Sequence, residues 1–257
     1  MKTHLPTTES PFALVRGDSY ELLEALPDGA VDHVFTDPPY AEKTHAGART
    51  NAGTKAKTGG EKLIGFDSIT PERFVWLSRQ FVRVAKRWVV MTCDWRHAAL
   101  LEDAMPDEFV RLGCWIKPNG MPQLTGDRPS TGWEAVAILH RKGRKKWNSG
   151  GHHAVWTYNK PNNTVHPTQK PVALVREWVR DFTDPGELVL DPFAGSGTTA
   201  MACLYEGRRT LNCEHNETYC AAIEARTAKL LTEDCLFRFT PAAKVKEPDL
   251  LDQLSGE

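Results

Sequence analysis

Apolar, strand-like segments that each end at an acidic residue are the feature of this sequence that most limits its fold. These segments are Val31–Thr36 before Asp37, Glu187–Leu190 before Asp191, and Thr210–Cys213 before Glu214. Helical patterns of apolar residues lie between them, and this alternation predicts a mainly parallel, doubly wound α/β sheet with helices on both faces. Ligands of such sheets bind at the carboxyl ends of strands. The three acidic residues therefore indicate one shared site.

The other elements follow from the same periodicities. Further strands are predicted at Leu14–Asp18, Trp88–Cys93, Phe109–Ile116 and Trp133–His140, the last two as an antiparallel pair. Helices are predicted at Pro71–Arg87, Arg96–Met105, Pro171–Phe182 (with Thr168 as N-cap), Thr198–Tyr205, and from the N-cap Asn216 to about Leu231. Residues 41–62 are predicted to form a long polar loop, and the chain from about Ala242 a weakly ordered tail.

Composition excludes several classes of protein. The 257 residues, 40% of them hydrophobic, are enough for one large domain or two small ones. No apolar run approaches the roughly 20 residues of a membrane span, and the first ten residues do not resemble a secretory signal. None of the six cysteines lies in a Cys-x-x-Cys pair, so we expect reduced thiols, a cytoplasmic protein and no metal site.

The segment Asp191-Pro-Phe-Ala-Gly-Ser-Gly-Thr198 joins a predicted strand to a helix. Gly195 and Gly197 allow a tight turn and a close approach of the backbone to a ligand. Glu214, 19 residues beyond Gly195, suits the two hydroxyls of a ribose. The pattern Gly195-x-Gly197-x-x-Ala200 fits a dinucleotide fingerprint and equally an adenosyl-methionine loop. No lysine follows the glycines, which excludes a Walker phosphate loop.

Asp37-Pro38-Pro39-Tyr40 follows a predicted strand and offers a carboxylate, rigid carbonyls and an aromatic ring. Asp37 and the Pro38 carbonyl can accept the two hydrogens of an exocyclic amine on a planar base, while Tyr40 stacks on that base. A base in a duplex must flip out to reach such a site.

A stretch of positive charge lies between these two motifs. Residues 117–160 carry eight basic residues against two acidic ones, in a chain whose net charge is −1. Tryptophans, a tyrosine, histidines and amides are interleaved with the basic residues, which favours a surface that binds nucleic acid. The residues we expect to contact it are Arg128, Arg141, Lys142, Arg144, Lys145, Lys146 and Trp147, with Lys43 from the 41–62 loop.

Together, the Asp37-Pro-Pro-Tyr40 motif and the Phe193-Ala-Gly-Ser-Gly197 loop resemble the S-adenosylmethionine-dependent amino-methyltransferases of DNA. The order of the motifs, and His166-Pro-Thr-Gln-Lys-Pro171, resemble the β class, whose order is a circular permutation of the usual methyltransferase sheet. The similarity covers residues 12–231 or so. It implies a catalytic half (1–116), a target-recognition insert (117–165), a cofactor-binding half (166–232) and a C-terminal tail (233–257).

The resemblance also implies roles for single residues. Asp37, Pro38 and Tyr40 would handle the target amine. Lys170 would offer a cation to the cofactor's carboxylate, Glu214 would hold the ribose, and Asp18 would accept from the adenine amine. The other residues implied to surround the cofactor are Thr168, Asp191, Phe193, Gly195, Ser196, Gly197 and Thr198.

The implied function is a site-specific restriction–modification methyltransferase that acts on double-stranded DNA in a prokaryote or phage. Asp rather than Ser at the head of the motif favours N6 of adenine over N4 of cytosine, which stays an alternative. No cysteine follows a proline, so C5-cytosine chemistry is disfavoured. An NAD-dependent oxidoreductase, a non-catalytic DNA-binding protein and an RNA substrate stay open, as do a homodimer and a cognate restriction nuclease.

Overall fold

A mixed sheet forms the centre of the computed structural model, which describes residues 5–40, 69–123, 126–162, 164 and 168–234. Its eight described strands lie in the order β1-β8-β7-β2-β3-β5-β4-β6. Their bounds are β1 Phe12–Arg16, β2 His33–Thr36, β3 Trp88–Cys93, β4 Phe109–Ile116, β5 Trp133–His140, β6 Val155–Thr157, β7 Leu188–Asp191 and β8 Arg209–Glu214. The first five strands of that order are parallel, and β5 is antiparallel to both β3 and β4. The predicted fold class is confirmed.

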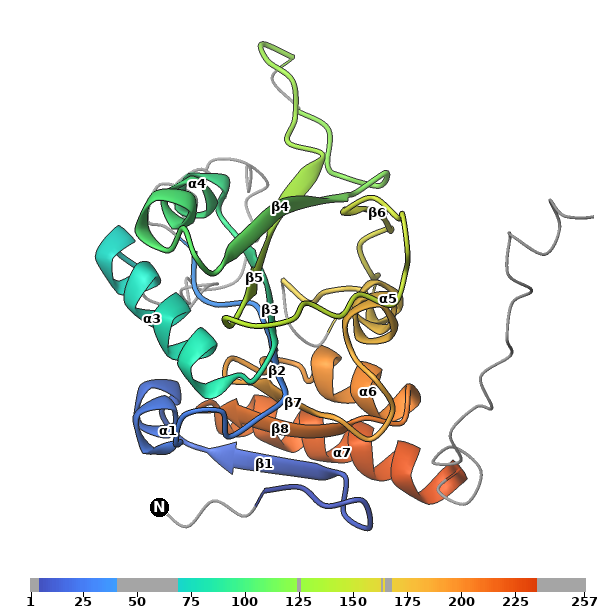
Figure 1. Cartoon of the computed structure of the whole chain (residues 1–257). Helices are drawn as coiled ribbons and strands as arrows, with labels where there is room; N and C mark the ends of the chain where they lie inside the picture. Colours follow the sequence, from blue (N-terminus) through green and yellow to red (C-terminus); the bar gives the residue numbers. More distant parts are fainter. Residues whose placement is uncertain (1–4, 41–68, 124–125, 163, 165–167, 235–257) are drawn as a thin grey trace, which may run out of the picture.

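Helices cover both faces of the sheet (Figure 1). On one face lie α1 (Ser19–Ala25), α3 (Pro71–Val84) and α4 (Trp95–Ala104), and on the other α5 (Val172–Phe182), α6 (Thr198–Tyr205) and α7 (Glu217–Asp234). Each face has its own buried apolar cluster, and successive residues of β3 alternate between them: Val89 and Met91 join one, Trp88 and Val90 the other. That period of two is expected for a strand buried on both faces.

The pairing of β2 with β7 creates the switch point of the sheet. From β2 the chain passes through α3 to β3, whereas from β7 it passes through α6 to β8 on the opposite face and in the opposite direction. The connections leave the sheet on both sides at this pair of strands. Ligands of doubly wound sheets bind at the carboxyl ends of the strands at such a switch point.

Most elements lie where the sequence predicts them. Four have the predicted bounds: β3, β4, β5 and α6. Asn216 caps α7 as predicted, because its Oδ1 accepts hydrogen bonds from the backbone N–H groups of Thr218 (2.9 Å) and Tyr219 (3.2 Å).

The main differences from the predictions are one shifted strand, two missed elements and one wrong N-cap. The strand predicted at Leu14–Asp18 is β1, two residues earlier, because Asp18 is the N-cap of α1, a helix that the periodicity did not reveal. Strand β6 was also not predicted; it is three residues long and pairs in parallel with β4. Thr168 is not the N-cap of α5, since that position is Pro171, which makes no side-chain cap bond.

Several predictions lie wholly or partly outside the described residues: the 41–62 loop with Lys43, the His166-Pro167 pair, Cys235 and the tail. The five described cysteines are free, and four of them are buried. Within the described ranges, no helix combines the length and apolar character of a bilayer span. No cluster of His, Cys, Asp or Glu side chains suited to a metal ion occurs in those ranges.

Candidate active site

The carboxyl ends of β2, β7 and β8 bring the three predicted acidic residues to one edge of the sheet. Strand β7 pairs with both β2 and β8, so Asp191 lies between Asp37 and Glu214 along this edge. The hydroxyl of Thr36 donates a hydrogen bond to Asp191 Oδ1 (2.9 Å) and so joins the ends of β2 and β7. The two sequence motifs therefore meet at the switch point.

Two side chains hold the Asp37 carboxylate. The hydroxyl of Thr92, on β3, donates to Oδ1, and Lys170 Nζ donates to Oδ2 at 2.6 Å. The Asp37 side chain nevertheless stays 27% exposed, against 9% for Lys170. A carboxylate has about four lone-pair sites. Asp37 is thus anchored on the protein side and still able to accept hydrogen bonds from a ligand.

Lys170 lies against the Asp37 motif. Its Nζ contacts the carboxylates of Asp37 and Glu134, the latter at 3.3 Å. Burial alone would lower the pKa of Lys170, but these carboxylates outweigh burial and raise it above its ordinary value. The role of Lys170 toward the cofactor's carboxylate stays a prediction; in this structure its ammonium neutralises two protein carboxylates. The Lys170 carbonyl accepts from the Thr198 hydroxyl (3.4 Å), which links this segment to the start of α6.

Tyr40 is fixed at both its hydroxyl and its ring. The hydroxyl donates to Glu134 Oε2 (3.0 Å), and Lys170 Nζ lies 5.5 Å from the centre of the ring. Burial, with the nearby Asp37 and Glu134 carboxylates, raises the pKa of Tyr40 well above its ordinary value. The phenol is therefore neutral at physiological pH and acts as a hydrogen-bond donor and an aromatic surface.

The glycine loop turns sharply between β7 and α6. Gly195 and Gly197 have φ values of +51° and +78°, and Gly197 is the N-cap of α6 in the left-handed region. A Cβ on Gly197 would lie 2.9 Å from Cγ1 of Ile223, whereas a Cβ on Gly195 would meet no atom within 4 Å. The loop is packed against α7 on one side and faces open space on the other.

Two buried carboxylates, Asp191 and Glu214, lie next to the loop. Glu214 accepts from the backbone N–H groups of Gly195 (Oε2, 2.8 Å) and Asn216 (Oε1, 2.8 Å), which fixes it beside the loop. Burial raises the pKa of Asp191 to about 6, although hydrogen bonds from hydroxyl and backbone groups oppose the shift. Acidic oxygens and an uncrowded glycine turn fit a ligand that offers hydroxyl and ammonium donors.

The remaining predicted cofactor residues lie near this loop or at the same edge. Ser196 and Thr198 are buried at the start of α6, and the Phe193 ring packs on Tyr20 and Phe81. Asp18 follows β1, the neighbour of β8, and its Oδ1 accepts from the backbone N–H groups of Tyr20 (2.6 Å) and Glu21 (3.3 Å). One role of Asp18 is therefore to cap α1. Thr168 lies two residues before Lys170.

Comparison with known proteins identifies the family. The family model for DNA methylases (N6_N4_Mtase) matches residues 31–225, which include both motifs. The chain belongs to this DNA methylase family. It is 27% identical over 252 residues to the type II methyltransferase M.XycI of Xanthomonas campestris pv. cyanopsidis, a match that covers 80% of this chain and 84% of the relative.

Two solved structures share the fold of this DNA methylase. The M1.HpyAVI–SAM complex matches with a TM-score of 0.60 and 24% identity, covering 83% of this chain and 98% of the other. The PvuII DNA methyltransferase (cytosine-N4-specific) matches with a TM-score of 0.65 and 19% identity, covering 86% and 87%. The match extends over most of both chains in each case.

Most of the predicted nucleic-acid-binding residues of the DNA methylase lie at the edge of the sheet opposite Asp37. His140, the last residue of β5, pairs with Trp88, the first residue of β3, so the chain that follows starts at the amino ends of the parallel strands. The residues placed there are Arg141, Lys142, Arg144, Lys145, Lys146 and Trp147. Their expected surface is therefore not continuous with the Asp37 site.

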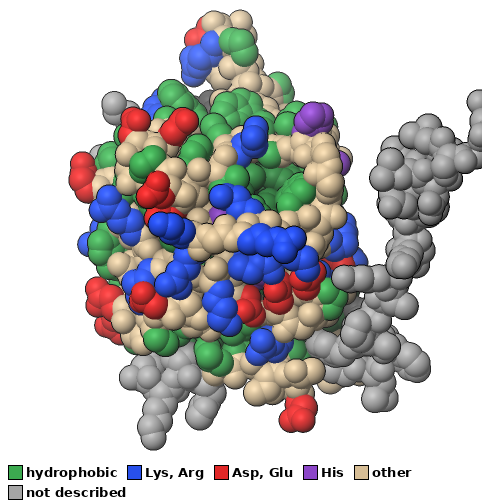
Figure 2. Space-filling view, in the orientation of Figure 1, with side chains coloured by type: hydrophobic (Ala, Val, Ile, Leu, Met, Phe, Trp, Pro, Cys, Tyr) green, Lys and Arg blue, Asp and Glu red, His purple; other side chains and the backbone are tan. Residues whose placement is uncertain are grey.

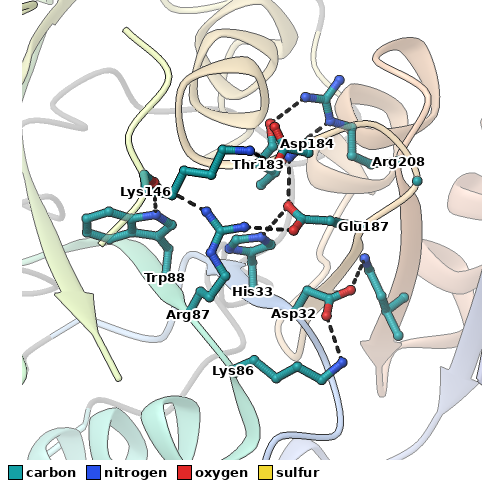
Figure 3. Close-up of polar contacts among 12 residues, drawn as sticks. Asp32, His33, Lys86, Arg87, Trp88, Lys146, Thr183, Asp184, Glu187 and Arg208 are labelled. Carbon is teal, nitrogen blue, oxygen red and sulfur yellow. Dashed lines mark hydrogen bonds and ion pairs between the residues drawn. The ribbon is translucent and has the colours of Figure 1, made fainter. Parts of the chain in front are cut away.

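Several of these side chains have structural partners at that opposite edge, and Figure 3 shows those of Lys146. Lys146 Nζ pairs with Asp184, and its carbonyl accepts from the Trp88 indole (2.6 Å). The Arg141 guanidinium donates to the carbonyls of Arg83 (3.3 Å) and Ala85 (3.4 Å). Figure 2 shows Lys and Arg side chains mixed with Asp and Glu on one face of the molecule, which is not a uniformly basic surface. Arg128, in contrast, lies between β4 and β5, on the side where Ile116 ends one strand and Trp133 begins the next.

The sequence patterns missed three residues that contact the site: Thr92, Lys117 and Glu134. Lys117 Nζ donates to Glu134 Oε1 (2.9 Å), and Glu134 in turn contacts Tyr40 and Lys170. For Glu134, the antiparallel direction of β5 is the feature from which its position could have been predicted. Because β5 runs against β3, its first residues lie beside the carboxyl end of β3 and hence at the site.

Proposed function

We propose that this DNA methylase transfers a methyl group from S-adenosylmethionine to the exocyclic N6 of an adenine flipped out of double-stranded DNA. The observation that carries the proposal is the position of the anchored Asp37 carboxylate beside Tyr40, one strand away from the open glycine turn. The family membership removes the NAD-dependent oxidoreductase, because the matching family is one of DNA methylases.

S-adenosylmethionine supplies the methyl group. We propose that Asp191 and Glu214 hold its ammonium and ribose groups, with the Gly195 turn against its open side. Asp37 and the Pro38 carbonyl accept the two amine hydrogens, which draws the nitrogen lone pair out of the ring system and toward the methyl carbon. Tyr40 holds the base by stacking. Catalysis is positioning and electrostatics, and the displaced proton leaves to Asp37 or to water.

Cytosine N4 is the second candidate, because the PvuII structure with a TM-score of 0.65 is described as cytosine-N4-specific. Either amine offers two hydrogens to Asp37 and Pro38. The test is to incubate DNA with the protein and isotope-labelled S-adenosylmethionine, hydrolyse it to nucleosides and separate them by mass spectrometry. The proposal expects N6-methyldeoxyadenosine; N4-methyldeoxycytidine alone would replace it with the second candidate, and no labelled nucleoside would remove both.

We expect the affinity for S-adenosylmethionine to fall as the pH drops below about 6. Burial raises the pKa of Asp191 to about 6, so the carboxyl becomes protonated below that pH and no longer attracts the ligand's ammonium group. Above it the carboxylate is charged and the affinity reaches a plateau; below it the dissociation constant rises by up to about tenfold per pH unit. Calorimetric titrations from pH 5 to 8 measure this. Asp191→Asn is expected to bind weakly at every pH, and a flat wild-type profile would exclude Asp191 as the ligand's partner.

Charge reversal is expected to weaken DNA binding only at the edge that holds Asp37. Arg128→Glu removes a cation between β4 and β5, at the edge that holds Asp37. It is expected to raise the dissociation constant for DNA several-fold and to reduce the slope of its logarithm against the logarithm of salt concentration by about one. The double variant Lys142→Glu, Lys145→Glu changes more charge, at the opposite edge. It is expected to change the dissociation constant for DNA less than about threefold. Fluorescence anisotropy at several salt concentrations measures both. The reverse ranking would place the duplex on the opposite edge.

A further inference from the structure

Glu134 connects the residues around the proposed base site in a way that the proposed function does not use. It is the second residue of β5, and its carboxylate has three partners: the Tyr40 hydroxyl (3.0 Å), Lys117 Nζ (2.9 Å) and Lys170 Nζ (3.3 Å). Through Lys170 it is one step from Asp37. Two carboxylates, two ammonium groups and a phenol thus form one continuous contact network.

Stability of the fold does not explain this network. The side chains of Lys117, Glu134 and Lys170 are only 12%, 22% and 9% exposed, so the charges have lost most of their water. Replacing such a buried ionic cluster by apolar side chains of similar size is often neutral or stabilising. Burial would raise the pKa of Glu134, yet Lys170 and Lys117 outweigh it and lower the pKa to about 2. The carboxylate is therefore charged at any pH at which the protein works.

The geometry shows what the charge can do. Oε2 of Glu134 receives both the Tyr40 hydroxyl and the Lys170 ammonium, so one atom sets the ring of Tyr40 and the cation that holds Asp37. Oε1 is bound by Lys117, which follows β4, so the carboxylate cannot rotate without breaking an ion pair. Strand β5 is fixed between β3 and β4. Glu134 therefore fixes the side chains of Tyr40 and Lys170 relative to the sheet.

We propose that Glu134, fixed by Lys117, is a positioning residue that orients the Tyr40 ring and the Lys170–Asp37 pair to receive the target base. The inference rests on the proposed function, since it assigns Tyr40 and Asp37 to the base. It adds that one carboxylate, that of Glu134, orients both the Tyr40 ring and, through Lys170, the Asp37 carboxylate, so a change at Glu134 displaces both. Glu134 itself does not touch the base.

The expected effect is on the transfer step and not on cofactor binding. Glu134→Ala removes the acceptor for Tyr40 and one partner of Lys170, and a misplacement of about 1 Å costs roughly 100-fold in rate. We therefore expect single-turnover methylation to fall 10- to 100-fold, with the dissociation constant for S-adenosylmethionine within about twofold of wild type. Glu134→Gln keeps an oxygen that can accept from Tyr40 but loses the charge, so an intermediate rate is expected.

A double-mutant cycle separates positioning from a general loss of structure. If Glu134 acts through the Tyr40 hydroxyl, Tyr40→Phe lowers the single-turnover rate in the wild-type background and costs much less in Glu134→Ala. The matched control is Glu206→Gln, because Glu206 also bridges two cations, Arg176 (2.7 Å) and Arg180 (2.8 Å), away from this site. It is expected to change thermal stability as Glu134→Gln does and to leave the rate unchanged.

The outcomes distinguish this inference from the proposed function. Wild-type protein that methylates no base overturns the proposed function. Wild-type protein that methylates adenine or cytosine, with Glu134→Gln at full rate, overturns the positioning role alone. Additive effects of Glu134→Ala and Tyr40→Phe also overturn it. If Glu134→Ala does not fold, Glu134→Gln and the same cycle with Tyr40→Phe decide the question.

Discussion

Replacing Asp37 with alanine is expected to abolish methyl transfer while S-adenosylmethionine still binds. The Asp37 carboxylate is held by Thr92 and Lys170 and is the proposed acceptor for the target amine. Without it only the Pro38 carbonyl is left to draw the amine lone pair toward the methyl carbon, and the rate of transfer is expected to fall by about 10³-fold or more. The glycine loop is anchored separately, because the Gly195 N–H donates to Glu214, which the Asn216 N–H holds in turn, so the cofactor site is expected to keep its shape. Labelled-methyl incorporation and calorimetry measure the two effects.

Two variants make the Asp37 result specific. Asp28→Ala removes a carboxylate that pairs with Arg83 and Arg141 at the opposite edge, and it is expected to leave transfer unchanged. Thr92→Val removes only the hydroxyl that donates to Asp37 Oδ1 and is expected to slow transfer less than Asp37→Ala does. Turnover by Asp37→Ala within threefold of wild type would exclude Asp37 from the reaction, whereas no methyl incorporation by the wild type would favour a non-catalytic DNA-binding protein.

The parts of the site that local sequence patterns predicted are those set by single strand ends. Asp37, Asp191 and Glu214 lie together because each follows or ends a parallel strand, and parallel strands end at one edge. Glu134 is different: its position depends on which way β5 runs and on its register against β3, where Cys93 pairs with Ala135. Register between distant strands depends on tertiary packing, which a local pattern does not contain.

The basic stretch shows a second limit of local patterns. Charge composition predicts that a surface attracts nucleic acid, but it does not predict the edge of the sheet on which that surface lies. Lys142 and Arg128 belong to the same stretch, yet β5 separates them and carries the chain from one edge to the other. Asp18 illustrates the same problem at short range, because a cap and a strand end have similar sequence patterns and only the bonds to Tyr20 and Glu21 distinguish them.

Alanine at Gly195 and alanine at Gly197 are expected to damage different properties of the protein. Both positions have positive φ, so each substitution carries the left-handed cost of about 1–2 kcal/mol. At Gly197 the new Cβ would also lie 2.9 Å from Cγ1 of the buried Ile223, so the expected loss in the free energy of unfolding is about 2–5 kcal/mol, or a fall in melting temperature of about 4–20 °C. At Gly195 the Cβ meets no protein atom, so the melting temperature is expected to fall less.

Cofactor affinity is expected to show the opposite order. The Gly195 Cβ would enter the space that we assign to S-adenosylmethionine, and overpacking of about 1–3 kcal/mol corresponds to roughly a 5- to 150-fold weaker complex. Thermal melts measure the loss of stability of both variants, and calorimetry measures their affinity for S-adenosylmethionine. In the Ile223→Ala background, which removes both Cγ atoms, Gly197→Ala is expected to cost no more stability than Gly195→Ala does in the wild type. No protein atom lies within 4 Å of the added Cβ, so the bound cofactor is what the methyl group would meet. Gly195→Ala with wild-type affinity would therefore show that the cofactor does not bind against this turn.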